Sequence, residues 1–266
     1  MKKVSLFLVV AGLTTMVAFG QKKEIRTVSG FTGINASSVF DITVTKGSTE
    51  SLTIETEEGV MPYVRSEVRN GVLHLYLDNG NRIKNIKTLK ASVVMKDLDK
   101  VLLSGTCKLT ANDLFTSAKF TGDCSGVSNL TVNVNTDQLN INASGACNVQ
   151  LRANVTGNAN LDVSGTSKIH GDLKAVHVKF NSSGVSSTEL TGSASDIKID
   201  ISGTAKIKGE NFEVQTASVE SSGTSAITLN VTDVLKVNSS GASTVNYTGT
   251  PVIEAKAGGV SKVRRM

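Results

Sequence analysis

The stretch IKIDISGT, residues 197–204, decides the fold of this 266-residue chain. Apolar side chains alternate with polar ones up to Ser202, and a glycine then interrupts the alternation. A period of two is typical of a β-strand with one buried face and one solvated face. Glycine tolerates the positive φ that many tight turns require, and serine forms hydrogen bonds with nearby backbone. The stretch therefore predicts a strand that ends in a sharp corner.

The same pattern recurs through the C-terminal two-thirds of the sequence. Its most constant part is a Ser-Gly pair followed by a small or β-branched residue, and successive glycines lie 18 to 21 residues apart. A unit this short cannot bury its apolar face alone, but stacked units bury a continuous core. The glycines of the nine copies, the last of which lacks the serine, are Gly105, Gly126, Gly145, Gly165, Gly184, Gly203, Gly223, Gly241 and Gly259.

Alignment of the copies on this glycine shows which side chains stack. The fourth residue before it is apolar in seven successive copies: Ile141, Leu161, Phe180, Ile199, Val219, Val237 and Ala255. About 19 residues at roughly 3.3 Å each make a contour of about 60 Å, the size of one solenoid turn. Each repeat is expected to hold two firm strands and a third side of variable length. Because parallel connections are right-handed, residues 96–266 predict an all-β fold, a right-handed parallel β-helix with turns of about 19 residues.

Two rival folds explain the repeat less well. A β-sandwich also has many short strands, but nothing in it requires the same type of side chain at equivalent positions of every repeat. A propeller blade of four strands needs roughly twice this period.

Residues 21–95 lack the Ser-Gly repeat. Alternation predicts strands over residues 39–44, 51–55 and 72–77, and Asn70-Gly71 predicts a hairpin turn. A solenoid end exposes unpaired strand edges. We therefore expect residues 21–95 to form an irregular N-terminal β cap continuous with the solenoid, or else early irregular turns of the solenoid itself.

The first twenty residues have the three parts of a secretory signal peptide. Two lysines precede the largely apolar run of residues 4–19, and small residues at Ala18 and Gly20 suit cleavage before Gln21. The run is shorter than the roughly 20 residues of a membrane-spanning helix. We expect export by a signal peptide, to the periplasm, or secretion to the cell surface, with no membrane domain of its own in the mature chain. The formal charge of +5 comes from scattered lysines, which argues against nucleic-acid binding.

Four short segments of the N-terminal part carry a family resemblance. They are VSGFTGI at 28–34, FDITVTKG at 40–47, LTIET at 52–56 and GVLHL at 71–75. Together with the Ser-Gly columns, over roughly residues 25–263, the chain resembles the "putative autotransporter adhesin, head GIN domain" family. The resemblance implies a secreted β-helical protein of Bacteroidetes-type bacteria with a role in adhesion.

A polar column is the main candidate for a binding site. It lies three residues before each glycine, between apolar columns, and therefore faces outward. The column either forms a linear array that binds a glycan or Ca²⁺ through its oxygens, or is a solvated face in which asparagines separate the acids. The second interpretation is favoured, since no calcium-binding nonapeptide is present, and no metal or cofactor is expected. The members are Asp123, Asn142, Asp162, Asn181, Asp200, Glu220 and Asn238.

Outward lysines lie two residues before members of this column. Lys179, Lys198 and Lys236 are expected to form ion pairs with the acids, which contribute little when exposed, or to bind a polyanion.

The three cysteines are expected to be free and buried. Cys107 and Cys147 occupy one column two turns apart, near 9.6 Å on a spacing of about 4.8 Å. A disulfide needs Cα atoms within about 7 Å. Cys124 lies in a different column and would need a favourable bend to pair. No disulfide is therefore predicted.

Nothing in the sequence forms a recognisable catalytic group. His74, His170 and His177 have no metal-binding spacing, and the Ser-Gly copies are turns rather than nucleophile elbows. The short repeats also leave little chain for the walls of a cleft. No catalytic residue is predicted, and the chain is not expected to be an enzyme.

The leading hypothesis is a non-catalytic extracytoplasmic adhesion module whose flat β-helix faces bind a glycan or another envelope protein. One alternative is a β-helix enzyme that acts on polysaccharides. Another is a structural, self-associating envelope protein, and a homo-oligomer is compatible with the sequence.

Overall fold

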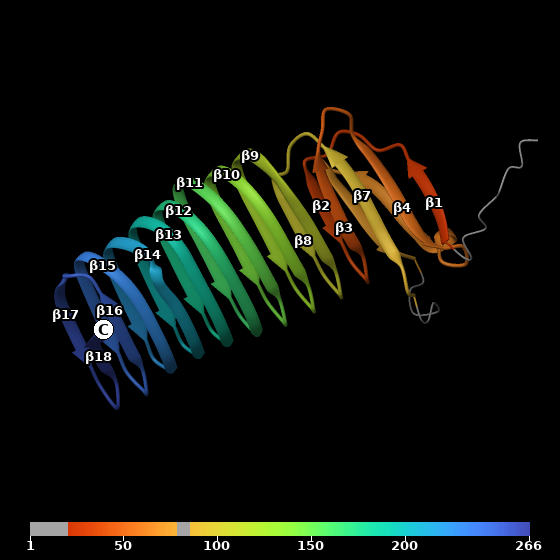
Figure 1. Cartoon of the computed structure of the whole chain (residues 1–266). Coiled ribbons are helices and arrows are strands. Elements are labelled where there is room, and N and C mark those ends of the chain that lie inside the picture. The colour runs from red at the N-terminus through yellow and green to blue at the C-terminus, as the bar shows by residue number, and fades with distance from the viewer. Residues whose placement is uncertain (1–20, 79–85) are drawn as a thin grey trace, which may run out of the picture.

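Each Ser-Gly repeat forms one turn of a parallel β-solenoid in the computed structural model, which describes residues 21–78 and 86–266 (Figure 1). The predicted all-β parallel solenoid is confirmed, since successive turns pair in parallel along nearly their whole length. The strands of these turns are β8 (Lys100–Leu103), β9 (Lys108–Cys124), β10 (Asn129–Ala143), β11 (Asn148–Val163), β12 (Thr166–Ser182), β13 (Val185–Ile201), β14 (Thr204–Ser221) and β15 (Thr224–Ser239). The last full turn holds β16 (Thr244–Thr248) and β17 (Val252–Ala257), and β18 (Lys262–Arg265) pairs with β16 as the start of a further turn.

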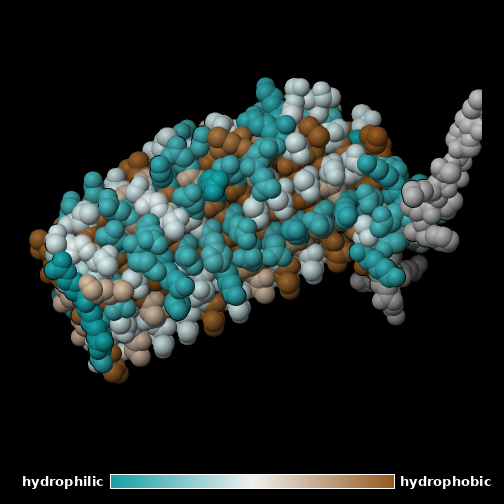
Figure 2. All heavy atoms as spheres, viewed as in Figure 1, coloured by the Kyte–Doolittle hydropathy of each residue, from teal (hydrophilic) through white to brown (hydrophobic). Residues whose placement is uncertain are grey.

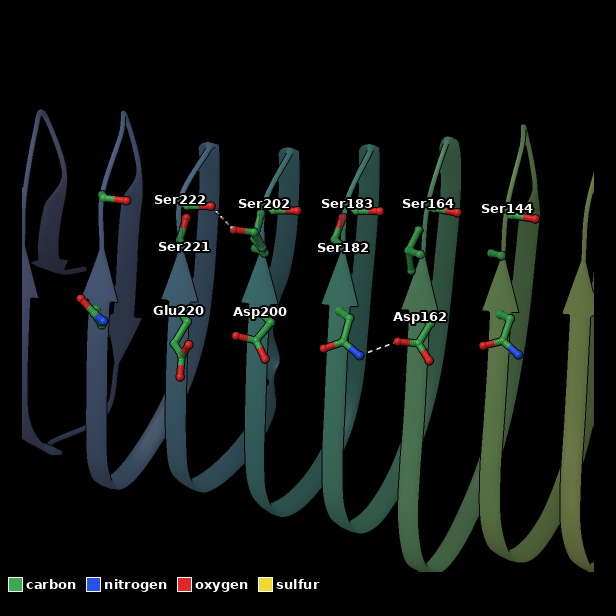
Figure 3. Close-up of a pocket in the computed structure, with 17 residues that line it drawn as sticks. Ser144, Asp162, Ser164, Ser182, Ser183, Asp200, Ser202, Glu220, Ser221 and Ser222 are labelled. Carbon is green, nitrogen blue, oxygen red and sulfur yellow. Dashed lines mark hydrogen bonds between the residues drawn. The ribbon is translucent and has the colours of Figure 1, made fainter.

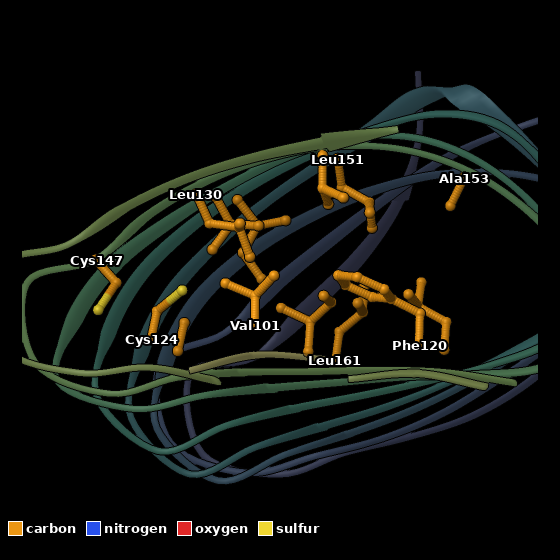
Figure 4. Close-up of a cluster of buried hydrophobic side chains, with 14 of the residues drawn as sticks. Val101, Phe120, Cys124, Leu130, Cys147, Leu151, Ala153 and Leu161 are labelled. Carbon is orange, nitrogen blue, oxygen red and sulfur yellow. The ribbon is translucent and has the colours of Figure 1, made fainter. Parts of the chain in front are cut away.

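The interior consists of apolar columns in register from turn to turn. Ile199 of β13 is level with Phe180 in the turn before it and with Val219 in the turn after it. These three side chains are at most 1% exposed. Figure 4 shows the buried side chains between the two facing sides of the flattened coil. Stacking like residues on like residues therefore builds the core, as the repeat predicts.

Glycine is required at the corner for two different reasons. Gly126 has a φ of +70°, and an added Cβ would lie 2.4 Å from the carbonyl oxygen of Gly105. Gly203 has no positive φ, yet its Cβ would lie 2.3 Å from the oxygen of Gly184. The explanation from φ alone is therefore incomplete. Close backbone stacking of one corner on the next excludes a side chain even where the φ would allow one.

The expected third side is not a separate strand in the described turns. Most full turns are one long strand that bends, as β13 does between its two corners. Register shifts take up the differences in turn length, for example between Glu189 and Thr191 where β13 pairs with β14. The bend keeps its hydrogen bonds to neighbouring turns, so no break in the strand is needed.

The N-terminal region contains a solenoid turn that is out of sequence order. This turn comprises β2 (Gly33–Ala36) and β3 (Asp41–Lys46). On one side this turn pairs with β8 and β9. On its other side it pairs with β6 (Val72–Leu77) and β7 (Leu89–Met95), which follow it in the chain. Residues 47–95 therefore fold back beneath the turn that precedes them in the chain.

The corner of this first turn has no glycine. Ser38 occupies the place of Gly105 with a φ of +83°, an uncommon conformation for a residue with a side chain. Thr106 donates its backbone N–H to the carbonyl of Ser38 at 2.7 Å, as later corners do to the preceding glycine. The described stack thus has one more corner than the glycine pattern indicates.

Antiparallel strands cover the N-terminal end. These are β5 (Val64–Arg69) on β6, β4 (Ser51–Glu57) on β7, and β1 (Gln21–Arg26) on β4, with a short 3₁₀ helix at Met61–Tyr63. The predicted hairpin at Asn70-Gly71 is confirmed, and both residues have positive φ. One continuous hydrophobic cluster runs from this end into the solenoid.

Candidate binding groove beside the solenoid corner

The structure brings all seven predicted polar residues into one row. Strand register aligns each with its counterpart in the next turn, and Lys256 continues the row into the last turn. We call the seven residues the polar row: Asp123, Asn142, Asp162, Asn181, Asp200, Glu220 and Asn238. Figure 3 shows Asp162, Asp200 and Glu220 in a row on the outer surface, one per strand. The solenoid core sets their spacing, because each member is separated from the next by one turn of about 4.8 Å.

Amides and acids within the polar row bind each other. The Asn142 amide donates to the carboxylate of Asp123, and the Asn181 amide donates to that of Asp162. Each asparagine thus lies against the acid of the preceding turn and separates it from the next charge. These contacts agree with the interpretation of the row as a solvated face in which amides keep the carboxylates apart.

Two acids of the row are instead linked through a lysine. The ammonium of Lys198 lies 3.6 Å from the carboxylate of Asp200 and 3.4 Å from that of Glu220. The two negative charges raise the pKa of Lys198 above its usual value. Among the other lysines of that column, Lys236 pairs with Glu254 in the last turn at 3.3 Å.

A row of serines runs parallel to the polar row. Each is the serine of a Ser-Gly pair, and its backbone N–H donates to the preceding turn, as Ser183 does to Val163 at 3.0 Å. Some hydroxyls also face the backbone, such as that of Ser222, whose Oγ lies 3.4 Å from the Ile201 carbonyl (Figure 3). The members of this serine row are Ser144, Ser164, Ser183, Ser202, Ser222 and Ser240.

The serine row and the polar row from Asn142 to Asn238 line an open groove of about 650 Å³ that spans six turns. Its wall carries carboxylate, amide and hydroxyl groups, which supply hydrogen-bond donors and acceptors at every turn. Among the described residues, no group of three or more His, Cys, Asp or Glu is placed to hold a metal ion. The groove's chemistry is therefore that of a repeated hydrogen-bonding surface.

A second column, polar in most turns, lies inside the corner two residues after the glycine and was not predicted as a group from the sequence; Ala205 interrupts it. Most of its side chains donate to the carbonyl of the serine three residues earlier, whereas the hydroxyls of Ser186 and Ser225 bond to those of Ser182 and Ser221. Ser128 reaches the Ser125 carbonyl at 2.8 Å, and Cys147 reaches that of Ser144 at 3.0 Å. The signal in the sequence is the recurrence of serine or cysteine at this position. We call this column the inner corner column: Cys107, Ser128, Cys147, Ser167, Ser186, Ser225 and Ser243.

The cysteines are free and buried. Cys107 and Cys147 occupy positions of the inner corner column that serines hold in other turns. Cys124 lies in a facing column of small and apolar residues, two residues before the glycine (Figure 4). Burial raises the pKa of the Cys124 thiol to about 12, and burial also raises the pKa values of the other two thiols. All three are therefore protonated and unreactive in the folded protein at neutral pH.

His170 and His177 each lie beside an acid of the next turn rather than beside each other. His177 lies 2.5 Å from Asp196, and His170 lies 3.8 Å from Glu189. His170 and Glu189 line a second, smaller groove of about 530 Å³ on the strand segments that follow the corner. Arg152, within the same groove, lies 3.4 Å from Asp172. Arg152 is thus matched by Asp172, and the ammonium of Lys208 lies 3.9 Å from the carboxylate of Glu189, so the groove offers little unpaired charge to a ligand.

Comparison with known proteins places the chain in a family. The sequence profile described as "Putative auto-transporter adhesin, head GIN domain" matches residues 30–171 and 153–251. The chain belongs to this family. The resemblance noted in the N-terminal segments is thereby confirmed, and members of the head GIN family are named as adhesins. No curated protein matches the chain significantly.

Solved structures share the fold at low sequence identity. A "putative adhesin" from Parabacteroides merdae ATCC 43184 has a TM-score of 0.73 at 19% identity, covering 94% of this chain and 97% of its own. One from Parabacteroides distasonis ATCC 8503 has the same TM-score and identity, with coverage of 92% and 97%. A "putative lipid binding protein" from the latter organism has a TM-score of 0.64 at 17% identity, with coverage of 94% and 98%. These likenesses show a common solenoid fold.

The predicted signal peptide lies outside the described residues. Within residues 21–78 and 86–266, no helix is long and apolar enough to cross a membrane.

Proposed function

We propose that this head GIN protein is an extracytoplasmic adhesion module that binds a glycan along the polar row. The single observation that carries the proposal is the groove itself, in which two polar rows keep register over six turns. A family named for adhesion supports the same conclusion.

The composition of the groove favours a polyhydroxylated ligand. Carboxylates and amides accept or donate hydrogen bonds to sugar hydroxyls, and serine hydroxyls can do both. Most members of the two rows are exposed, so a ligand reaches them without a conformational change. An extended glycan laid along the solenoid would contact one polar pair per turn, and many weak contacts would add up to useful affinity.

Binding without catalysis fits the exposure of the acids in the groove. A glycosidase needs a carboxylic acid with a raised pKa in an environment that limits water. Asp200 is partly exposed and Glu220 is exposed, and both carboxylates lie beside the ammonium of Lys198 at the open surface. The open groove offers no enclosure around them.

The proposal also requires export of the protein from the cytoplasm. We expect residues 1–20 to be removed and the mature protein to begin at Gln21, on the cell surface or in the periplasm. Mass spectrometry of the protein purified from its native cell envelope tests this, and an intact N-terminal Met1 would contradict it.

A glycan array probed with residues 21–266 tests the binding proposal directly. We expect enrichment of a subset of glycans with no released oligosaccharide in the supernatant. Released product would support the polysaccharide-active enzyme instead, and concentration-dependent assembly without glycan binding would support a structural protein.

Matched variants locate the site. The double variant Asp200→Ala, Glu220→Ala removes two acids of the groove, and Asp172→Ala, Glu189→Ala removes two acids of the second groove. We expect about a tenfold or larger loss of glycan affinity for the first pair only. Equal effects of both pairs would contradict binding along the polar row.

A further inference from the structure

In the part of the chain that the structure describes, no strand covers the last solenoid turn, whereas antiparallel strands cover the N-terminal end. Among the described residues, β17 pairs only with β15, and β18 pairs only with β16. All six residues of β17 are exposed, including Val252 at 68% and Ile253 at 41%. In Figure 1 these strands form the end opposite to β1 and β4, with no strand beyond them. Each therefore presents a free row of backbone N–H and C=O groups.

This end also carries unpaired positive charge. Lys256, Lys262, Arg264 and Arg265 are all exposed, and none forms an ion pair with any residue that the structure describes. Glu254, the one acid of β17 and β18, is already paired with Lys236. Figure 2 shows a group of hydrophilic side chains beside hydrophobic ones at this end of the molecule. Three of the four cations belong to β18, so its free edge is strongly basic.

We propose that the free edge of β18 binds an acidic, extended segment of a partner protein as an added strand. The partner's backbone would satisfy the row of N–H and C=O groups, as in other cases of strand addition. Acidic side chains on the outer face would lie opposite Lys262 and Arg264. On the inner face, apolar side chains of the partner would pack on the half-buried Val263.

Charge argues against a second copy of this chain as the occupant. If two β18 edges met, Lys262, Arg264 and Arg265 of one copy would face the same cations of the other. Like charges directly opposite each other across a strand pair are destabilising. Lysine and arginine on an exposed edge are also a common protection against self-association. The edge therefore disfavours its own copy and favours an acidic strand.

A fluorescent octapeptide that alternates Glu and Val tests the proposal by anisotropy with the full chain. We expect saturable binding that weakens as salt is added. The same peptide with alternate amides N-methylated keeps its charge but loses strand hydrogen bonding, and we expect it to bind at least about tenfold more weakly. Equal binding of both peptides would show simple attraction of polyanions and would overturn the proposal.

A matched pair of variants locates the edge. Lys262 shares its register column with Lys168, which lies in the middle of the solenoid, where no edge is free. We expect Lys262→Glu to weaken peptide binding at least about tenfold and Lys168→Glu to leave it unchanged. Equal losses would overturn the proposal.

Two further outcomes concern other occupants. Binding of heparin or of anionic lipid vesicles as tight as that of the peptide, with the same dependence on Lys262, would overturn the strand proposal in favour of an anionic polymer or surface. Dimerisation of the full chain in sedimentation experiments, lost in Lys262→Glu, would overturn it in favour of self-association. Glycan binding along the polar row does not depend on either outcome.

Discussion

Truncation of Ile199 measures how strongly the stacked core holds the solenoid together. Ile199→Ala removes three carbon atoms from a side chain that is fully buried between Phe180 and Val219. Such truncations cost about 2–5 kcal/mol, and the cost is higher where the surroundings cannot collapse into the cavity. Backbone ladders fix both neighbouring turns, so we expect about 4 kcal/mol, in the upper half of that range.

Urea unfolding followed by circular dichroism measures this loss. The control is Lys198→Gln, the adjacent outward residue in the same strand, which we expect to leave the unfolding midpoint essentially unchanged. A change to an acid at this position would be a poor control, since Lys198 lies between Asp200 and Glu220. Ile199→Asp should abolish cooperative folding, because it buries an unpaired charge. A loss below about 1 kcal/mol for Ile199→Ala would refute the stacked-column explanation of stability.

Three further predictions address the corner. Gly203→Ala places a Cβ 2.3 Å from the Gly184 carbonyl oxygen, and it should cost about 1–3 kcal/mol in urea unfolding, whereas Gly59→Ala, with open space around it, should cost little. Cys147→Ser keeps the hydrogen bond to the carbonyl of Ser144, whereas Cys147→Val loses it at a cost of about 1 kcal/mol in stability. The serine variant should therefore unfold at a higher temperature than the valine variant. The reverse order would contradict the role of the inner corner column. Because burial raises the pKa of Cys124 to about 12, its contribution to stability is intact below pH 9 and falls as pH rises from 9 toward 12. Replacement by alanine should flatten that part of the stability profile, and an unchanged slope would contradict the assignment.

The sequence predicted the solenoid well because its determinants are local and repeated. Inward and outward positions alternate through residues 197–201, and register then carries the same alternation to every turn. The polar row was predicted from the same alternation and repeat spacing. The columns predicted that lysines would pair with the acids but not the individual partners, since the donation from Asn142 to Asp123 and the position of Lys198 between Asp200 and Glu220 depend on rotamers.

The N-terminal region was harder to predict because its order in space differs from its order in the chain. The β2–β3 turn lies between layers formed by later segments. Its corner uses Ser38 at positive φ, so the glycine that marks other corners is missing. Only tertiary pairing with β6 and β8 identifies these residues as a turn of the solenoid.

The same stacking that stabilises the core dictates what kind of ligand the surface suits. Each polar pair repeats with the turn, so a ligand gains contacts only if it is extended and runs along the solenoid axis. A compact molecule would touch two or three turns and gain little affinity from such shallow contacts. Glycan affinity should therefore increase with oligosaccharide length until the ligand spans the six turns of the groove, and then become constant. An affinity that is independent of length from the disaccharide upward would place binding at a single local site and would contradict the use of the polar row as a whole.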